Sequence, residues 1–172
     1  MDSCCFIDAV KGDVGDALPA DRLNDLWYIR HCLKAGQAGE IDVITSTLTI
    51  AESRRADAPP TDEVKRLFNS ILTSGKVVQL AQMTQAIAER ARDLHWEHNI
   101  NLGGADAIHV ATALTVGCKE FLTFDRKKAR SPLAFAAELA KLGLRVIPPS
   151  DTALLPADYL QGKLTDPTVP SS

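Results

Sequence analysis

The stretch that decides the fold is Leu102–Asp125, LGGADAIHVATALTVGCKEFLTFD. It opens with Gly103 and Gly104, which suit a sharp entry into a helix because glycine takes backbone conformations closed to other residues. From about residue 105 to 116 nearly every face is apolar, and a helix that is apolar all round is a buried one. The stretch closes with residues 120–125, EFLTFD, which predict a short strand with a carboxylate at its carboxyl end.

The polar residues of this predicted helix include Asp106 and His109, which lie one turn apart and so on one face. A carboxylate at Asp106 is favoured by the helix dipole and the free N–H groups of the first turn. His109 has two interpretations, a packed and hydrogen-bonded histidine or a residue that contacts a substrate. Asp125 ends the strand, and ligands gather at the carboxyl ends of strands in open parallel sheets.

The rest of the chain alternates β-branched runs with amphipathic segments. Residues 4–10 predict the end of a first strand turning into a short helix, and residues 11–19 a loop. Further strands are predicted at 41–46, 76–80 and 144–147, and helices at 20–35, from 47 to the break at Pro59-Pro60, 61–74, 84–98 and 132–142. This alternation predicts a parallel sheet with helices on both faces, an α/β/α sandwich.

Length and composition predict one ordinary globular domain. At 172 residues, with 45% hydrophobic and 24% charged residues, the chain can bury a real core. Five of its nine prolines follow Ile147, so we expect a domain over residues 1–147 and a tail over residues 148–172. No apolar run has membrane-spanning length and the N-terminus does not resemble a signal peptide, so we expect a cytoplasmic protein. The four cysteines show no C-x-x-C spacing, which favours buried thiols over a zinc site or disulfides.

Four acidic residues occupy comparable places along the predicted elements: Asp2, Glu52, Asp106 and Asp125. In a doubly wound sheet such positions can converge on one edge, where the carboxylates repel unless a cation neutralises them. Oxygen ligands without histidine or cysteine suit Mg²⁺ or Mn²⁺. Each acid also has a simpler interpretation, as a terminal residue, a solvated helix acid, a helix-start residue or a cap. Only their joint placement favours a metal site.

Four segments resemble the PIN-domain family, especially the toxin ribonucleases of VapC type: DS at residues 2–3 with Ile7, STLTIAE at 46–52, LGGADAIHVATAL at 102–114 and FLTFD at 121–125. The resemblance covers roughly residues 2–147. It implies an α/β/α sandwich and a divalent-metal-dependent endoribonuclease, often paired with an antitoxin protein and often dimeric. The acids of the family's motif fall on Asp2, Glu52, Asp106 and Asp125. Ser3 matches the small hydroxyl residue beside the first acid, and Thr123 the residue before the last.

The chain departs from the family at its start, because the family usually has several apolar residues before its first acid and this chain has one. We therefore expect either a short first strand or a translation start further upstream.

Contacts with partners rest on a few local features, because the net charge of -3 gives no bulk attraction to nucleic acid. Two basic clusters flank the acids, and they could hold an RNA backbone or be solvated faces; they are Arg54-Arg55 and Arg126 to Arg130, which includes Lys127. Trp27 and Tyr28 lie on the first long helix, and such aromatics are enriched in interfaces, which favours a homodimer.

We expect a metal-dependent endoribonuclease that acts on RNA, the toxin of a toxin–antitoxin pair with a small antitoxin protein as its partner. The alternative is a catalytically impaired module of the same fold that acts through RNA or protein contacts.

Overall fold

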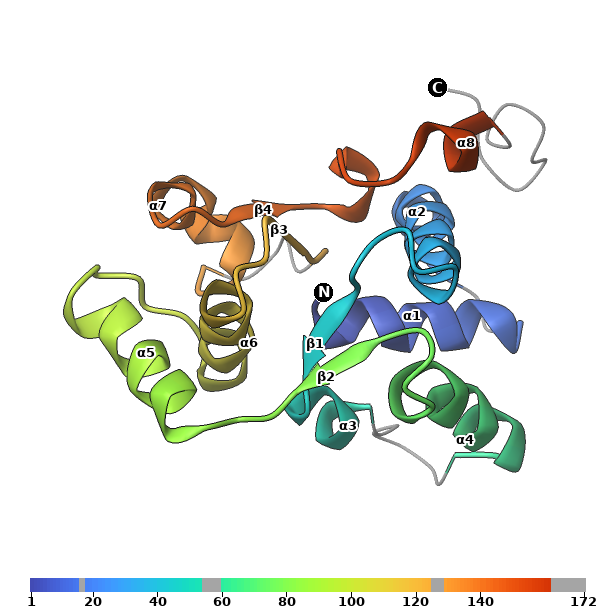
Figure 1. Ribbon diagram of the computed structural model, residues 1–172, viewed down its shortest axis with the longest axis horizontal. Helices are drawn as coiled ribbons and strands as arrows, with labels where there is room; N and C mark the ends of the chain where they lie inside the picture. The colour runs from blue at the N-terminus through green and yellow to red at the C-terminus, as the bar shows by residue number, and fades with distance from the viewer. Residues whose placement is uncertain (16–17, 54–59, 125–128, 162–172) are drawn as a thin grey trace.

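Short parallel strands alternate with helices in the computed structural model, which describes residues 1–15, 18–53, 60–124 and 129–161 (Figure 1). The strands are β1 (Ile44–Ser46), β2 (Gln79–Ala81), β3 (Glu120–Leu122) and β4 (Arg145–Ile147). The helices are α1 (Ser3–Asp13), α2 (Ala20–Gln37), α3 (Leu48–Glu52), α4 (Asp62–Phe68), α5 (Gln85–Trp96), α6 (Gly104–Thr115), α7 (Ala136–Lys141) and α8 (Ala157–Leu160). A π turn, η1 (Asn69–Thr73), continues α4, and η2 (Pro132–Phe135) and η3 (Pro149–Asp151) are 3₁₀ turns.

Met1 and Asp2 stand where the middle strand of a parallel sheet would be. β1 pairs with β2 and β3 with β4, in two separate two-stranded sheets. The α-amino group of Met1 donates to the carbonyl of Ile44 on β1 at 2.9 Å, and the N–H of Asp2 donates to the carbonyl of Leu122 on β3 at 3.0 Å. These two residues therefore bridge the sheets and give the order β2, β1, residues 1–2, β3, β4. No strand is assigned at residues 1–2, and α1 begins at Ser3, so the predicted end of a first strand within residues 4–10 is wrong.

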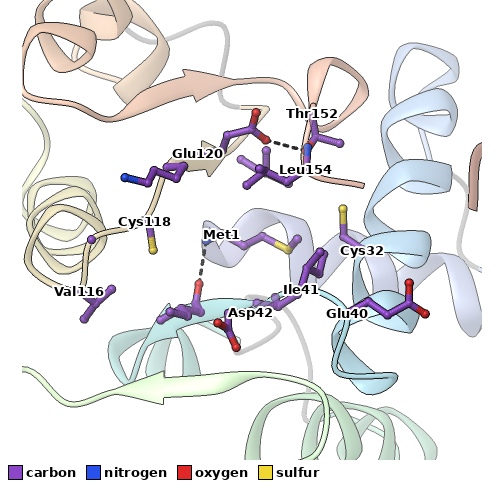
Figure 2. Close-up of a pocket in the computed structure, with 15 residues that line it drawn as sticks. Met1, Cys32, Glu40, Ile41, Asp42, Val116, Cys118, Glu120, Thr152 and Leu154 are labelled. Atoms are coloured by element: carbon purple, nitrogen blue, oxygen red, sulfur yellow. Dashed lines mark hydrogen bonds between the residues drawn. The ribbon is translucent and has the colours of Figure 1, made fainter. Parts of the chain in front are cut away.

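A cavity of about 460 Å³ opens beside this bridge, on the amino-terminal side of the strands. Its lining comes from both facing edges, including Ile41 and Asp42 on one side and Cys118 and Glu120 on the other, with Cys32 of α2 as a wall (Figure 2). Within the described residues, the two sheets are thus joined only through residues 1–2. We call the cavity that separates the amino ends of β1 and β3 the slot.

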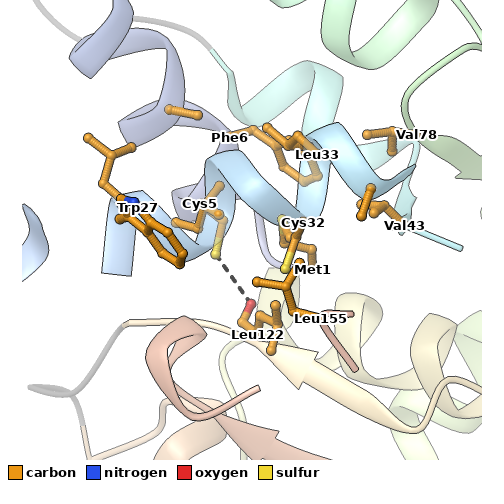
Figure 3. Close-up of a cluster of buried hydrophobic side chains, with 14 of the residues drawn as sticks. Met1, Cys5, Phe6, Trp27, Cys32, Leu33, Val43, Val78, Leu122 and Leu155 are labelled. Atoms are coloured by element: carbon orange, nitrogen blue, oxygen red, sulfur yellow. Dashed lines mark hydrogen bonds between the residues drawn. The ribbon is translucent and has the colours of Figure 1, made fainter. Parts of the chain in front are cut away.

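The core has two clusters of buried side chains, one on each face of the strands. The first contains Phe6 of α1, Leu33 of α2 and Val43, and is closed by Leu155 from the chain after β4 (Figure 3). The second packs α5 and α6 against β3, β4 and α7. In Figure 1, α1, α2 and α4 lie on one side of the strands, and α5, α6 and α7 on the other. The prediction of a three-layer α/β/α sandwich is confirmed.

The predicted loop over residues 11–19 is wrong in its first part, because α1 continues to Asp13. Gly12, predicted in the loop, lies inside the helix and lets α1 approach α2 closely. A Cβ atom at Gly12 would stand 2.7 Å from the Cδ2 of Leu26. The chain leaves the helix at Gly15, whose φ of +78° favours glycine.

Trp27 does not offer an interface surface, contrary to the sequence-based prediction. Its side chain is 5% exposed, belongs to the first core cluster and stacks on His31 with 3.8 Å between ring centroids. Tyr28 is half-buried and meets Trp27 edge-on. Trp27 therefore gives no support to a homodimer through this helix, because the face of α2 that carries it packs into the core.

The segment after β4 packs on the domain as far as it is described. Pro149 and Leu155 are buried, and the N–H of Ser150 donates to the Oδ1 of Asp25 on α2 at 3.0 Å. All four cysteines are free thiols, and Cys5 and Cys32 are buried. No helix within the described ranges is both long and apolar enough to cross a membrane.

Candidate functional site

The Asp2 carboxylate is buried at the junction of the bridge and α1, with 4% of the residue exposed. Asp2 is the N-cap of α1, and its Oδ1 accepts from the N–H of Ser3 at 2.7 Å and from the Ser3 hydroxyl at 3.4 Å. Its Oδ2 accepts from the hydroxyl of Thr123 at 2.6 Å and from the thiol of Cys4 at 3.3 Å. None of these donors carries a charge. The donors that these described residues supply to the Asp2 carboxylate are therefore neutral dipoles.

Ser3 and Thr123 were predicted as substrate-binding residues, and both donate to the Asp2 carboxylate instead of standing apart from it. Thr123 follows β3 directly, is fully buried, and its N–H donates to the carbonyl of Ile147 on β4 at 3.1 Å. The strand end thus aims the Thr123 hydroxyl at Asp2. Cys4 was not singled out by the sequence, although its place in the first turn after an N-cap aspartate was the available signal.

Glu52, the last residue of α3, is held by His109 of α6. The Nε2 of His109 donates to the Oε2 of Glu52 at 2.6 Å, with 2% of the histidine side chain and 30% of the glutamate side chain exposed. The Nδ1 of His109 has no hydrogen-bond partner among the described residues. Of the two interpretations of His109, the packed and hydrogen-bonded one is confirmed. Its partner was not predicted, because the two residues are 57 positions apart.

Asp106 lies in the first turn of α6, as predicted, and is half-buried. The two glycines before it act differently from the expectation, because neither has a positive φ. Gly103 is the N-cap with φ of -61°, and a Cβ atom there would stand 3.3 Å from the Oδ2 of Asp106. The glycine therefore gives room to the carboxylate instead of supplying an unusual backbone conformation.

Three of the four predicted acids can be located. α6 packs against β1, and His109 links Glu52 to this helix one turn after Asp106. Asp2 lies at the carboxyl end of the strands beside Thr123. Asp125, two residues after Thr123, lies outside the described residues. Among the described residues no three histidine, cysteine or acidic side chains are grouped to hold a metal ion. The available donors are carboxylate oxygens, which are the ligand type that Mg²⁺ and Mn²⁺ prefer.

The predicted RNA-binding cations Arg54, Arg55, Arg126 and Lys127 also lie outside the described residues. Arg130, from the same cluster, is described and is engaged within the fold. Its guanidinium donates to the Oδ1 of Asn101 at 2.8 Å and to the carbonyl of Leu102 at 2.9 Å. Arg130 thus fixes the turn that enters α6 and is partly withdrawn from any role in phosphate binding.

A comparison with protein families finds the PIN domain over residues 1–132. The chain belongs to the PIN domain family. PIN domains are generally metal-dependent nucleases that act on nucleic acid, and they typically bind divalent metals such as Mg²⁺. Neither a curated protein nor a solved structure matches the chain.

Proposed function

We propose that this PIN domain is a divalent-metal-dependent endoribonuclease of VapC type, the toxin of a toxin–antitoxin pair. The observation that carries the proposal is the Asp2 carboxylate, which is buried at the carboxyl end of the strands with uncharged donors as its partners. Among the described residues no charged side chain donates to this carboxylate; a buried charge without such a partner is costly, and a bound cation offsets that cost. The family match over residues 1–132 includes this residue.

In this proposal Asp2, Glu52, Asp106 and Asp125 hold Mg²⁺ or Mn²⁺. A divalent ion bound there supplies activation of water and neutralises charge that develops on the phosphodiester. The chain's own residues then have positioning roles. Thr123 and Ser3 orient the carboxylate of Asp2, and Arg54, Arg55, Arg126 and Lys127 hold the RNA backbone beside the acids.

The direct test is cleavage of a labelled RNA by the purified chain with Mn²⁺, with EDTA as the chelator. We expect EDTA to abolish cleavage and added Mn²⁺ or Mg²⁺ to restore it. Asp106→Asn removes one proposed ligand, and we expect it to stop cleavage while circular dichroism stays unchanged. The matched control is Asp62→Asn, the same change in the first turn of α4, where the acid is exposed. Cleavage that persists in EDTA would contradict the metal mechanism.

The second candidate is a PIN-fold binding module with an impaired site. It is favoured by the two-residue bridge in place of a middle strand. The same assay separates the two functions, because the module would retain RNA in a binding assay with Mn²⁺ and leave it intact.

The toxin role needs its own test, in cells. We expect expression of the chain to arrest growth, Asp106→Asn to relieve the arrest, and co-expression of a small protein from an adjacent reading frame to restore growth. Growth arrest by Asp106→Asn at the same protein level would argue against toxicity through RNA cleavage.

A further inference from the structure

The bond between His109 and Glu52 is the feature that the proposed function leaves unexplained. It joins the end of α3 to the middle of α6 through an almost fully buried imidazole. The Oε2 of Glu52 accepts this bond, and the carboxylate has a second oxygen, Oε1, for another ligand. The pair links two helices that are far apart in the sequence and ties the side chain of Glu52 to α6.

Glu52 needs such an anchor. It is the last residue of a five-residue helix whose N-cap makes no side-chain bond. Its side chain is 30% exposed, and a free glutamate side chain has several rotamers whose loss costs entropy on ordering. A bond to a buried ring selects one of these rotamers before any ligand binds.

His109 is costly for the fold if its role is packing. Its Nδ1 is buried and has no partner among the described residues, and an unpaired buried nitrogen costs free energy that an apolar side chain would not. The ring also has little freedom to seek another partner. The cavity beside it, lined by Thr45 and Thr112 among others, measures about 10 Å³, so one water molecule is the largest partner that Nδ1 can gain there.

We propose that His109 is a positioning residue that holds the carboxylate of Glu52 beside Asp106, so that both can bind one divalent cation. Asp106 precedes His109 by three residues on α6, a rise of about 4.5 Å along the helix axis. The bond therefore fixes the position of the Glu52 carboxylate, which belongs to α3, relative to α6. This inference rests on the proposed metal site. Some residues do not touch the metal but hold one of its ligands in place through a hydrogen bond. Replacing such a residue changes the metal affinity.

The test is Mn²⁺ binding by the full chain, measured by electron paramagnetic resonance of free Mn²⁺. We expect His109→Leu, which removes the donor, to weaken Mn²⁺ binding by about tenfold or more. We expect His109→Gln, whose amide N–H can replace Nε2, to restore most of the affinity, and the shorter His109→Asn to fail. The Gln and Asn variants decide the question even if the Leu variant does not fold. Thr112→Val is the matched control, because Thr112 is buried one turn later and donates within its own helix to Ile108.

A double-mutant cycle shows whether His109 acts through Glu52. In the Glu52→Gln background, we expect His109→Leu to cause no further loss of Mn²⁺ affinity. Unchanged affinity in both His109→Leu and His109→Asn, or a full further loss in the Glu52→Gln background, would overturn the inference and leave the proposed nuclease intact. A wild-type chain that binds no Mn²⁺ would overturn the proposed metal site itself, and the inference with it.

Discussion

Thr123 is the residue on which the buried charge of Asp2 depends most directly, since its hydroxyl donates to Oδ2 at 2.6 Å and is fully buried. Thr123→Val keeps the shape and removes the donor. We predict that the free energy of unfolding falls by about 1–3 kcal/mol, because a buried carboxylate oxygen loses a partner. Urea unfolding of the metal-free chain at neutral pH measures this change.

The control for this variant is Thr112→Val, the same substitution at another buried threonine. The hydroxyl of Thr112 donates to the carbonyl of Ile108 in its own helix at 2.7 Å, and such bonds contribute little to stability. Equal losses in the two variants would mean that Thr123 stabilises the fold as any buried hydroxyl does, without a special role at Asp2.

Cys32 makes the stability of the protein sensitive to alkaline pH. Burial, with a smaller contribution from the charge of Glu120, raises the pKa of the Cys32 thiol from 9.0 to about 12. Between these values the unfolded chain loses the thiol proton and the folded chain keeps it. Below about pH 9 this thiol has no effect on the free energy of unfolding. As the pH rises from about 9 to 12, the free energy of unfolding falls by up to about 1.4 kcal/mol per pH unit.

Urea unfolding at pH 8, 9, 10 and 11 tests this prediction. We expect Cys32→Ala to show a shallower loss of stability above pH 9 than the wild type. Some slope remains, because burial also raises the pKa of Cys5 and of Cys118. The slopes are compared, not the absolute stabilities, since alanine also removes packing. Parallel pH profiles for the two proteins would contradict the assignment.

At the scale of elements, Glu120 of β3 fastens the chain that follows β4. Its carboxylate accepts from Arg145 at 2.7 Å, from the Thr152 hydroxyl at 2.6 Å and from the N–H of Ala153 at 3.1 Å. We predict that Glu120→Ala lowers the free energy of unfolding by about 1–3 kcal/mol, because these donors lose their acceptor. It should also speed hydrogen exchange at the amide of Ala153.

The comparison for Glu120 is Glu138→Ala on α7, where the glutamate is exposed. A surface change of this kind is expected to stay within about 0.5 kcal/mol. If both variants are equally stable, the segment after β4 rests on the domain without being fastened by Glu120. The domain boundary at residue 147 stays a prediction.

Elements could be predicted from the sequence where the pattern is local. The buried character of α6 follows from its apolar run, and the alternation of strands and helices follows from periodicity. Gly12 and Trp27 were misassigned for a shared reason. Each is explained by a neighbour on another helix, Leu26 for the glycine and the core around α1 for the tryptophan. Local patterns carry no information about such neighbours.

The same reason limits the prediction of the site. The placement of Asp2, Asp106 and Glu52 at element ends was visible in the sequence, because acids there stand out. The bond from His109 to Glu52 was not visible, because it depends on how α3 meets α6. The spacing of three residues between Asp106 and His109 was the one local hint.

At the scale of the whole molecule, the net charge of -3 leaves RNA binding to local cations. We predict that replacing Arg126 and Lys127 with alanine flattens the log–log salt dependence of RNA binding, by about 0.7 for each lost phosphate contact on single strands. Binding is measured in Ca²⁺ over a salt series. The preferred RNA sequence should not change, because phosphate contacts carry no base information.

The charge-matched control replaces Lys34 and Lys76, which are exposed and lie near the amino ends of the strands, away from Asp2. It changes the net charge equally, so a slope that falls in both double variants would reflect overall charge and not a local RNA path. The homodimer also stays a prediction at this scale. Light scattering at roughly tens of micromolar, the range of weak dimers, measures it.

The burial of Met1 bears on how the protein is prepared in the laboratory. Met1 is 9% exposed and its amino group faces the carbonyl of Ile44 at the mouth of the slot between β1 and β3. An affinity tag or fusion partner attached ahead of Met1 would therefore begin at that slot, one residue from Asp2. A purification tag placed there would be held against the strands, and assays of metal or RNA binding are better made with the tag at the other end of the chain.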